Sequence, residues 1–279
     1  GELLEDPVMV DSISIYRNNV GTWSRDGDSL MYVQFKSMPG ARESLVIRSI
    51  KDHKEREIMF PWYFHNKIGT VAWTSNSAVI VDGGSSDHIG LHTFDLKSGE
   101  ITAAFDHGDK GFFQRFKTNR TGSEFFIEMR RHQPGIVSMD PETNSSTRLL
   151  DGAVVAASTC VSPDDRFLAF LRNNPQNGKT IIEILDLENK DLRILTSHDQ
   201  GILSNPLVWA SDGNSLVVGV NLSESEKGLW SVSLDDPSNP IFIDLPDAVN
   251  STLVLSPDGR HFAYQGGTIR GELFYLTSE

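Results

Sequence analysis

The sequence predicts an all-β fold, a single six-bladed β-propeller of four-stranded antiparallel blades. A short turn motif recurs along all 279 residues at intervals of about 46 residues, a period typical of propellers and related arrays. Each interval contains four short strand-like segments separated by residues that favour turns. No segment shows the sustained periodicity of an amphipathic helix.

The repeat consists of a leading residue, a Ser or Ala, and an Asp-containing turn before the next strand. Its clearest copies are 23–30, 161–168, 209–216 and 255–262, and weaker copies begin at Trp73 and Thr118. An Asp side chain can accept hydrogen bonds from nearby backbone N–H groups, and Gly can adopt a positive φ. The motif therefore predicts a tight hairpin between the first two strands of each unit.

The units follow one another without a break, so a single domain over 1–279 is expected. In the fourth unit the strands are expected at 157–161, 167–171, 180–185 and 192–195. The boundaries expected for the six blades are 17–60, 61–105, 106–150, 151–195, 196–244 and 245–279, the last completed by 7–16.

The last unit is short by one strand. Only two strand-like segments, 261–265 and 272–276, follow its turn, whereas the chain begins with an extra alternating segment at 8–16. We expect this N-terminal strand to complete the last blade, because closing the ring removes an open sheet edge.

The composition narrows the classes of partner. A net charge of −13 argues against nucleic acid, which requires clustered Lys and Arg. No apolar stretch approaches the ~18 residues of a membrane span, so direct membrane insertion is not expected. Residues 1–6 lack the basic and apolar regions of a secretory signal.

The sequence indicates no catalytic residue and no cofactor. The tetrapeptide Gly27–Leu30 resembles a lipase motif, but 213–216 occupies the same repeat position, so it is interpreted as turn and strand start. No Gly-x-Ser-x-Gly nucleophile elbow is present. The single Cys160 lies in an apolar run and is expected in the core rather than as a reactive thiol.

Histidines, aromatic residues and cations gather in the connections between units and between the second and third strands of a unit. In antiparallel blades these connections share one face of the disc, and loops with several aromatics suit binding. The alternative is that the histidines merely tolerate loops while the aromatics pack beneath them. Whether the histidines hold a metal stays open. The candidate binding residues are Trp62, Tyr63, His65, His88, His107, Phe112, Arg130, His132 and His198.

The turn motif resembles the Ser-Pro-Asp-Gly repeat of TolB-like propellers. It occurs as Ser162-Pro163-Asp164-Asp165 and as Ser256-Pro257-Asp258-Gly259, each followed by an apolar-Ala-apolar strand. The resemblance implies a protein-interaction propeller in the periplasm or another extracytoplasmic location. Related propellers form extracytoplasmic parts of membrane-tethered regulators and lids over serine peptidase domains. We therefore expect a monomeric domain of a larger protein.

These observations favour a non-enzymatic scaffold or sensor that binds a protein or peptide through one loop face. Two alternatives remain. One is a small-molecule or ion-sensing extracytoplasmic domain of a membrane-tethered regulator. The other is the gating propeller of a serine hydrolase whose catalytic domain lies outside these residues.

Overall fold

The computed structural model describes most of the chain, and every element in the described part is a β-strand. Within it there is no helix with the length and apolar character needed to cross a membrane. The described residues are 8–11, 19–34, 44–60, 71–75, 77–85, 88–106, 113–129, 133–143, 145–155, 158–174, 176–199, 203–221, 223, 227–243, 253–266 and 272–277.

The strands form six four-stranded antiparallel sheets, each built from strands consecutive in the chain except the last. The first two contain β2 (Asn19–Trp23), β3 (Ser29–Gln34), β4 (Ser44–Ser49) and β5 (Glu55–Met59), then β6 (Val71–Ser75), β7 (Ala78–Ser85), β8 (His88–Asp95) and β9 (Ile101–Asp106). The next two contain β10 (Phe113–Thr118), β11 (Phe125–Met129), β12 (Gly135–Asp140) and β13 (Ser145–Asp151), then β14 (Thr159–Val161), β15 (Phe167–Asn173), β16 (Lys179–Asp186) and β17 (Leu192–Asp199). The last two contain β18 (Leu203–Trp209), β19 (Ser215–Asn221), β20 (Lys227–Ser233) and β21 (Ile241–Ile243), then β22 (Leu253–Leu255), β23 (His261–Gly266), β24 (Glu272–Thr277) and β1 (Val8–Asp11).

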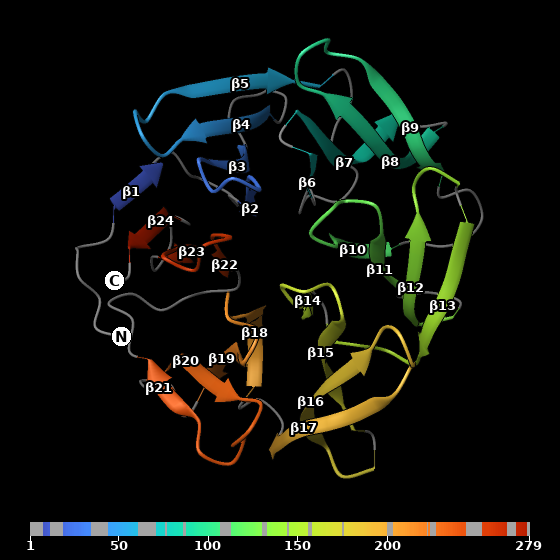
Figure 1. The fold of residues 1–279 in the computed structure, drawn as a ribbon, viewed down its shortest axis with the longest axis vertical. Coiled ribbons are helices and arrows are strands. Elements are labelled where there is room, and N and C mark those ends of the chain that lie inside the picture. Colours follow the sequence, from blue (N-terminus) through green and yellow to red (C-terminus); the bar gives the residue numbers. More distant parts are fainter. Residues whose placement is uncertain are drawn as a thin grey trace.

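The sheets stand around a central axis as the blades of a propeller (Figure 1). The first strand of each motif-bearing unit is innermost: β2, β6, β10, β14, β18 and β22. The predicted β-propeller of four-stranded antiparallel blades is confirmed.

The N-terminal strand belongs to the same sheet as the C-terminal strand. Strand β1 pairs antiparallel with β24, with Val8 opposite Tyr275 and Met9 opposite Phe274. It thus supplies the fourth strand beside β22, β23 and β24, as the short last unit predicts. The expected strand extended to residue 16, and its residues 12–16 lie outside the described part.

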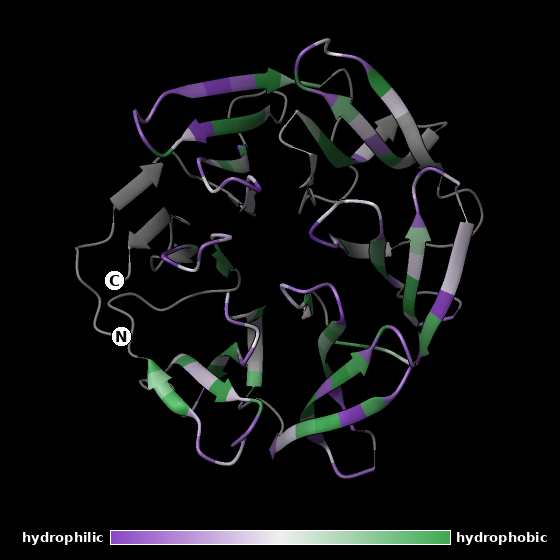
Figure 2. Ribbon diagram, in the orientation of Figure 1, coloured by the Kyte–Doolittle hydropathy of each residue, from purple (hydrophilic) through white to green (hydrophobic). Residues whose placement is uncertain are grey.

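The core lies between neighbouring sheets rather than in one central mass. Six apolar clusters are found in the described residues, and each joins two adjacent sheets. Cys160 of β14 packs with Trp209 of β18, for example, so the predicted core position of the cysteine is confirmed. Outer strands such as β5 carry hydrophilic, exposed residues (Figure 2).

We predict that removing β1 strongly destabilises the propeller. A chain that starts at residue 12 leaves β24 paired only with β23, which exposes unpaired backbone groups at the outer edge of the sheet. The midpoint of thermal unfolding is expected to fall by at least about 5 °C.

The control for this truncation is a chain that starts at Val8, because it keeps β1 and removes only the residues before it. Circular dichroism melts of both chains measure the effect. Equal midpoints for the two truncations would show that β1 does not hold the last sheet.

Candidate binding site

The motif turns are closed by the same side-chain hydrogen bonds in three of the sheets. The Ser162 hydroxyl donates to Asp164 Oδ1 at 2.5 Å, and the Phe167 N–H donates back to Ser162 Oγ at 2.8 Å. The pairs Ser24 with Asp26 and Ser256 with Asp258 repeat this arrangement. The interpretation of these aspartates as turn-forming residues is confirmed, and the lipase-like tetrapeptide belongs to such a turn.

In two of these turns the hydrogen bonds favour the ionised carboxylate. The hydrogen bond from the Ser162 hydroxyl holds the pKa of Asp164 below its usual value, against an opposing contribution from burial. Burial also opposes ionisation of Asp258, but hydrogen bonds from Ser256 and the Arg260 N–H outweigh it and lower that pKa.

The position after the turn aspartate faces the turn of the preceding sheet. Gly259 has a φ of 70°, and a Cβ added there would lie 2.7 Å from Ser211 Cβ. Gly122 also has a φ of 70°, and its Cβ would lie 2.6 Å from the Thr74 carbonyl oxygen. Glycine at this position therefore serves both the turn and the close approach of neighbouring sheets.

Asp165 replaces this glycine in the fourth sheet and uses the same direction to make a bond. It has a φ of 61°, and its Oδ1 accepts a hydrogen bond from the Arg120 backbone N–H at 2.6 Å. A carboxylate thus links the turns of the third and fourth sheets, at a position where Gly122 and Gly259 approach the preceding sheet by close packing.

Three tryptophans join the inner strands of neighbouring sheets. The indole N–H of Trp209 donates to the Cys160 carbonyl at 3.2 Å. Trp73 donates to the Thr22 carbonyl at 3.1 Å, and Trp23 donates to the Val254 carbonyl at 3.1 Å. Donors and acceptors occupy equivalent repeat positions, so each indole satisfies one backbone carbonyl of the preceding inner strand.

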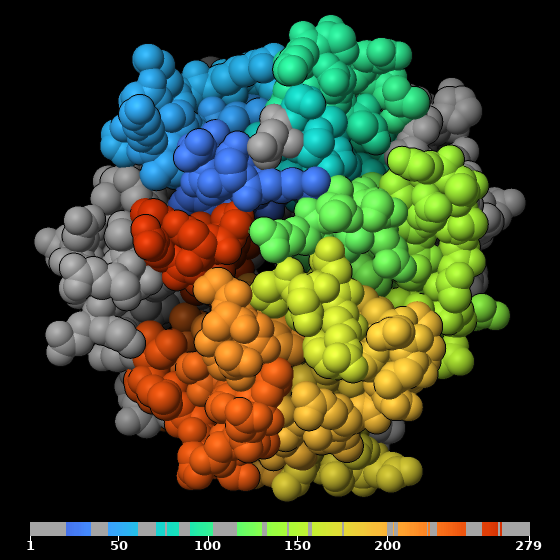
Figure 3. Space-filling model, in the orientation of Figure 1, coloured from blue at the N-terminus to red at the C-terminus, as the bar shows by residue number. Residues whose placement is uncertain are grey.

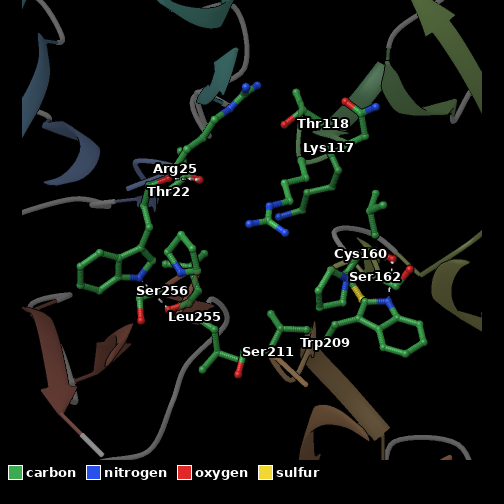
Figure 4. Close-up of a pocket in the computed structure, with 18 of the residues that line it drawn as sticks. Thr22, Arg25, Lys117, Thr118, Cys160, Ser162, Trp209, Ser211, Leu255 and Ser256 are labelled. Carbon is green, nitrogen blue, oxygen red and sulfur yellow. Dashed lines mark hydrogen bonds between the residues drawn. The ribbon is translucent and has the colours of Figure 1, made fainter. Parts of the chain in front are cut away.

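A cavity of about 340 Å³ lies where the inner strands meet their turns. Residues from all six sheets line it. Figure 3 shows a hollow at the centre of this face, bordered by blue, green and orange-red segments. In Figure 4 the labelled side chains of Arg25, Lys117, Ser211 and Ser256 are arranged around it. Its volume falls in the range of pockets that hold small ligands or single side chains.

The lining of the cavity is cationic. Among the residues that the structure describes, the lining includes Arg25, Lys117 and Arg120 and one carboxylate, that of Asp165. Arg25 donates to the Thr74 carbonyl and lies against Gly122. Burial lowers the pKa of Arg25, while the charge of Asp165 opposes that shift. The positive side chains therefore surround a single negative group.

Most of the candidate residues named from sequence lie outside the described part of the chain: Trp62, Tyr63, His65, His107, Phe112, Arg130 and His132. Two can be placed, and both correct the expectation that they lie in loops. His88 is the first residue of β8 and pairs with Ser85. His198 lies in β17 opposite Thr180. The hairpins extend further than the turn composition suggested.

His198 has structural contacts. Its ring lies 4.9 Å from that of Trp230 in the next sheet, and its Nε2 is 3.1 Å from Thr196 Oγ1. Burial and the charge of Lys179 lower its pKa, so it is mainly neutral at pH 7. In the described residues no group of three or more His, Cys, Asp or Glu side chains could hold a metal ion.

The cavity lies at the opposite end of the channel from the loop face proposed from sequence. The connections between units lead into the first residues of the inner strands, whereas the motif turns that build the cavity follow the last residues of these strands. Composition of the loops did not point to Lys117, Arg120 or Asp165. The signal was instead the departure from the repeat, since Thr118 stands where three other units carry Trp and Asp165 stands where four other units carry Gly.

Comparison with known proteins shows the fold. No protein-family model and no curated protein sequence matches the chain. The structure of TolB from Acinetobacter baumannii matches with a TM-score of 0.70 at 15% identity, over 91% of this chain and 64% of TolB. The chain therefore spans less than two thirds of that protein.

Two further solved structures are similar over nearly their whole length. The calcium-binding protein regucalcin from Agrobacterium tumefaciens matches with a TM-score of 0.67 at 13% identity, over 97% of this chain and 94% of regucalcin. An oligogalacturonate lyase from Vibrio parahaemolyticus matches with a TM-score of 0.64 at 10% identity, over 97% and 92%. At these identities the similarity establishes a β-propeller and nothing about activity.

We predict that Trp209→Phe lowers the free energy of unfolding by about 1–3 kcal/mol. The ring is largely kept, but the Cys160 carbonyl loses its indole donor in a buried joint. Chemical denaturation measures the change. Trp230→Phe is the control, because its indole N–H has no hydrogen bond recorded among the described residues. A smaller loss for Trp209→Phe than for Trp230→Phe would contradict the role of the indole bond.

We predict that Asp164→Asn destabilises the protein at pH 6 and that the difference shrinks below about pH 4. The folded-state pKa of Asp164 lies below its unfolded value. Its ionised form therefore contributes stability above the unfolded pKa, and that contribution is lost as the pH falls through the folded pKa.

Denaturant titrations of wild type and variant from pH 6 to pH 3 measure this difference. Asp28→Asn, an exposed carboxylate in another motif turn, is the control for the loss of one negative charge. A penalty for Asp164→Asn that stays constant across the range would contradict the prediction.

Proposed function

We propose that this chain is a non-enzymatic binding scaffold or sensor that holds a segment of a protein or peptide in the cavity at the channel mouth. The cavity carries this proposal, because residues from all six sheets converge on it. A closed ring of six blades would keep such a site rigid, and rigid sites lose little free energy to ordering on binding.

The polar groups in the cavity support binding rather than chemistry. The Ser162 hydroxyl is engaged by its own turn, where it donates to Asp164 and accepts from Phe167. Burial raises the pKa of the Cys160 thiol, although Lys117 opposes that shift, so it is protonated at neutral pH. A nucleophile needs a suitable base or a lowered pKa. The carboxylate that accepts the Ser162 proton has a pKa below its usual value and is therefore a weak base, and the pKa of the thiol is raised.

The likeness to TolB supports the wider context of the proposal. Together with the Ser-Pro-Asp-Gly turns it favours an extracytoplasmic protein-interaction domain within a larger protein. The loop residues Trp62, Tyr63 and Phe112 stay candidates for a second contact surface at the other end of the channel. Mutating them to Ala and measuring partner capture tests that surface separately.

We predict that Thr118→Trp reduces peptide binding at least about tenfold by filling the cavity. Thr118 is half-buried in the lining, where an indole would occupy part of the volume. Peptides selected from a random display library against the wild-type chain serve as ligands, and their affinity is measured by surface plasmon resonance.

Thr102→Trp is the matched control, because Thr102 is exposed on the outer strand β9. The proposal is supported if only Thr118→Trp loses binding while both variants melt like wild type. Peptides that bind all three chains equally would place binding outside the cavity and overturn the proposal.

A further inference from the structure

The charge of the cavity is opposite to that of the chain. The protein carries a formal net charge of −13, but the cavity has three cationic side chains and one carboxylate in its lining. A concave site with low-dielectric walls concentrates the field of its charges and attracts ions of the opposite sign. The cavity is thus a positive centre in an acidic molecule.

The charged side chains among the described lining residues are also mainly donors. The indole N–H groups of Trp23, Trp73 and Trp209 are already used by backbone carbonyls, so the rings offer a ligand only apolar surface. The guanidinium of Arg120 and the ammonium of Lys117 also line the cavity, and both groups can only donate. Such a set fits a ligand that accepts hydrogen bonds, and charged acceptors form the strongest ones.

Asp165 marks where an anionic group is stabilised. Its carboxylate accepts the Arg120 N–H, and its charge acts on Arg25. Arg25 in turn lies against Gly122, in the same turn as Arg120. One built-in anion therefore sits among the cations, and the lining keeps an excess positive charge beyond it.

The rim of the cavity has the opposite sign and limits the size of the ligand. Four turns each place an exposed aspartate beside a lining residue: Asp26, Asp164, Asp212 and Asp258. These carboxylates would repel an extended polyanion that crosses the rim. A compact anion that enters the centre meets mainly the cations.

We infer that the cavity binds a compact anionic group, a carboxylate or phosphate, held by Lys117, Arg120 and Arg25. This inference rests on the proposed binding function and names the chemistry of its ligand. The group can belong to a small free anion or to the end of a peptide chain. Both present the same oxygen acceptors to the same donors.

The decisive variant is Asp165→Asn, which we predict to tighten anion binding about three- to tenfold at low ionic strength. The amide oxygen can still accept the Arg120 N–H, and Asn tolerates a positive φ, so the turn is kept. The change removes a negative charge from the cavity. Isothermal titration with inorganic phosphate and with citrate measures affinity, and the gain is expected to shrink in 0.5 M NaCl.

The opposite change is Lys117→Gln with Arg120→Gln, expected to weaken binding at least about tenfold. If this double variant fails to fold, Arg120→Gln alone tests the point, because that side chain is exposed. Matched controls make equal charge changes at exposed positions outside the lining. Asp191→Asn is the control for the expected gain in affinity, and the double variant Lys97→Gln with Arg193→Gln is the control for the expected loss of affinity.

Two acetylated tetrapeptides of the same sequence, one with a free C-terminal carboxylate and one amidated, distinguish the source of the anionic group. Binding of only the free acid assigns it to a peptide end, whereas binding of phosphate or citrate alone assigns it to a small free anion. The inference is overturned if none of these probes binds saturably, or if the cavity variants behave like their controls. In that case, if Thr118→Trp still abolishes binding of the selected peptides, the proposed peptide-binding function is retained and only the anionic nature of the ligand is rejected.

Discussion

The joint between inner strands of neighbouring sheets is the constraint on which this structure depends. Each inner strand is a sheet edge, so some of its backbone groups have no partner in its own sheet. At three joints an indole N–H satisfies one such carbonyl, and the ring fills the space between the sheets. The bond from Trp23 to Val254 connects residues 231 positions apart. It therefore closes the ring from the inside, while the pairing of β1 with β24 closes it from the outside.

Three joints lack this indole, because Thr118, Val161 and Leu255 stand at the leading position of the third, fourth and sixth sheets. The third sheet carries Thr118 instead of tryptophan at the leading position, and its turn brings Lys117 and Arg120 to the channel. The joint between the third and fourth sheets, where Val161 stands in place of an indole, uses polar hydrogen bonds, from the Arg120 N–H to Asp165 and from the Thr159 hydroxyl to Glu128. Replacing a ring with smaller and charged groups gives up apolar packing in that joint. It also leaves room for a ligand and supplies the charges to bind it.

The fold could be predicted from the sequence because its signals are local and repeated. The turn formed by Ser162 and Asp164 needs residues only five apart in the chain, and the same residues recur in other units. The closing role of β1 also followed, since a missing strand at one end matched an extra strand at the other.

The site could not be predicted in this way. The loop residues were chosen by composition, which does not show that Lys117 and Asp165, 48 positions apart, line one cavity. The expected end of the outer strand was also wrong. The sequence placed it at residue 195, but His198 still lies in β17 and pairs with Thr180 of β16.

A repeat of this kind separates stability from recognition. Positions that keep the repeat, such as Ser256 and Gly259, are held by bonds and close contacts within and between turns, so changes there act first on folding. Positions that depart from it are free to differ, because the joints on either side keep the ring closed. In this chain Lys117 and Asp165 are such departures, because the other units carry uncharged residues at the position of Lys117 and four of them carry glycine at the position of Asp165. Both side chains line the same cavity. When the same repeat lines a channel on all sides, only residues that depart from the repeat make one side of the channel chemically different from the others. They are therefore the residues through which a symmetric scaffold can bind an asymmetric ligand.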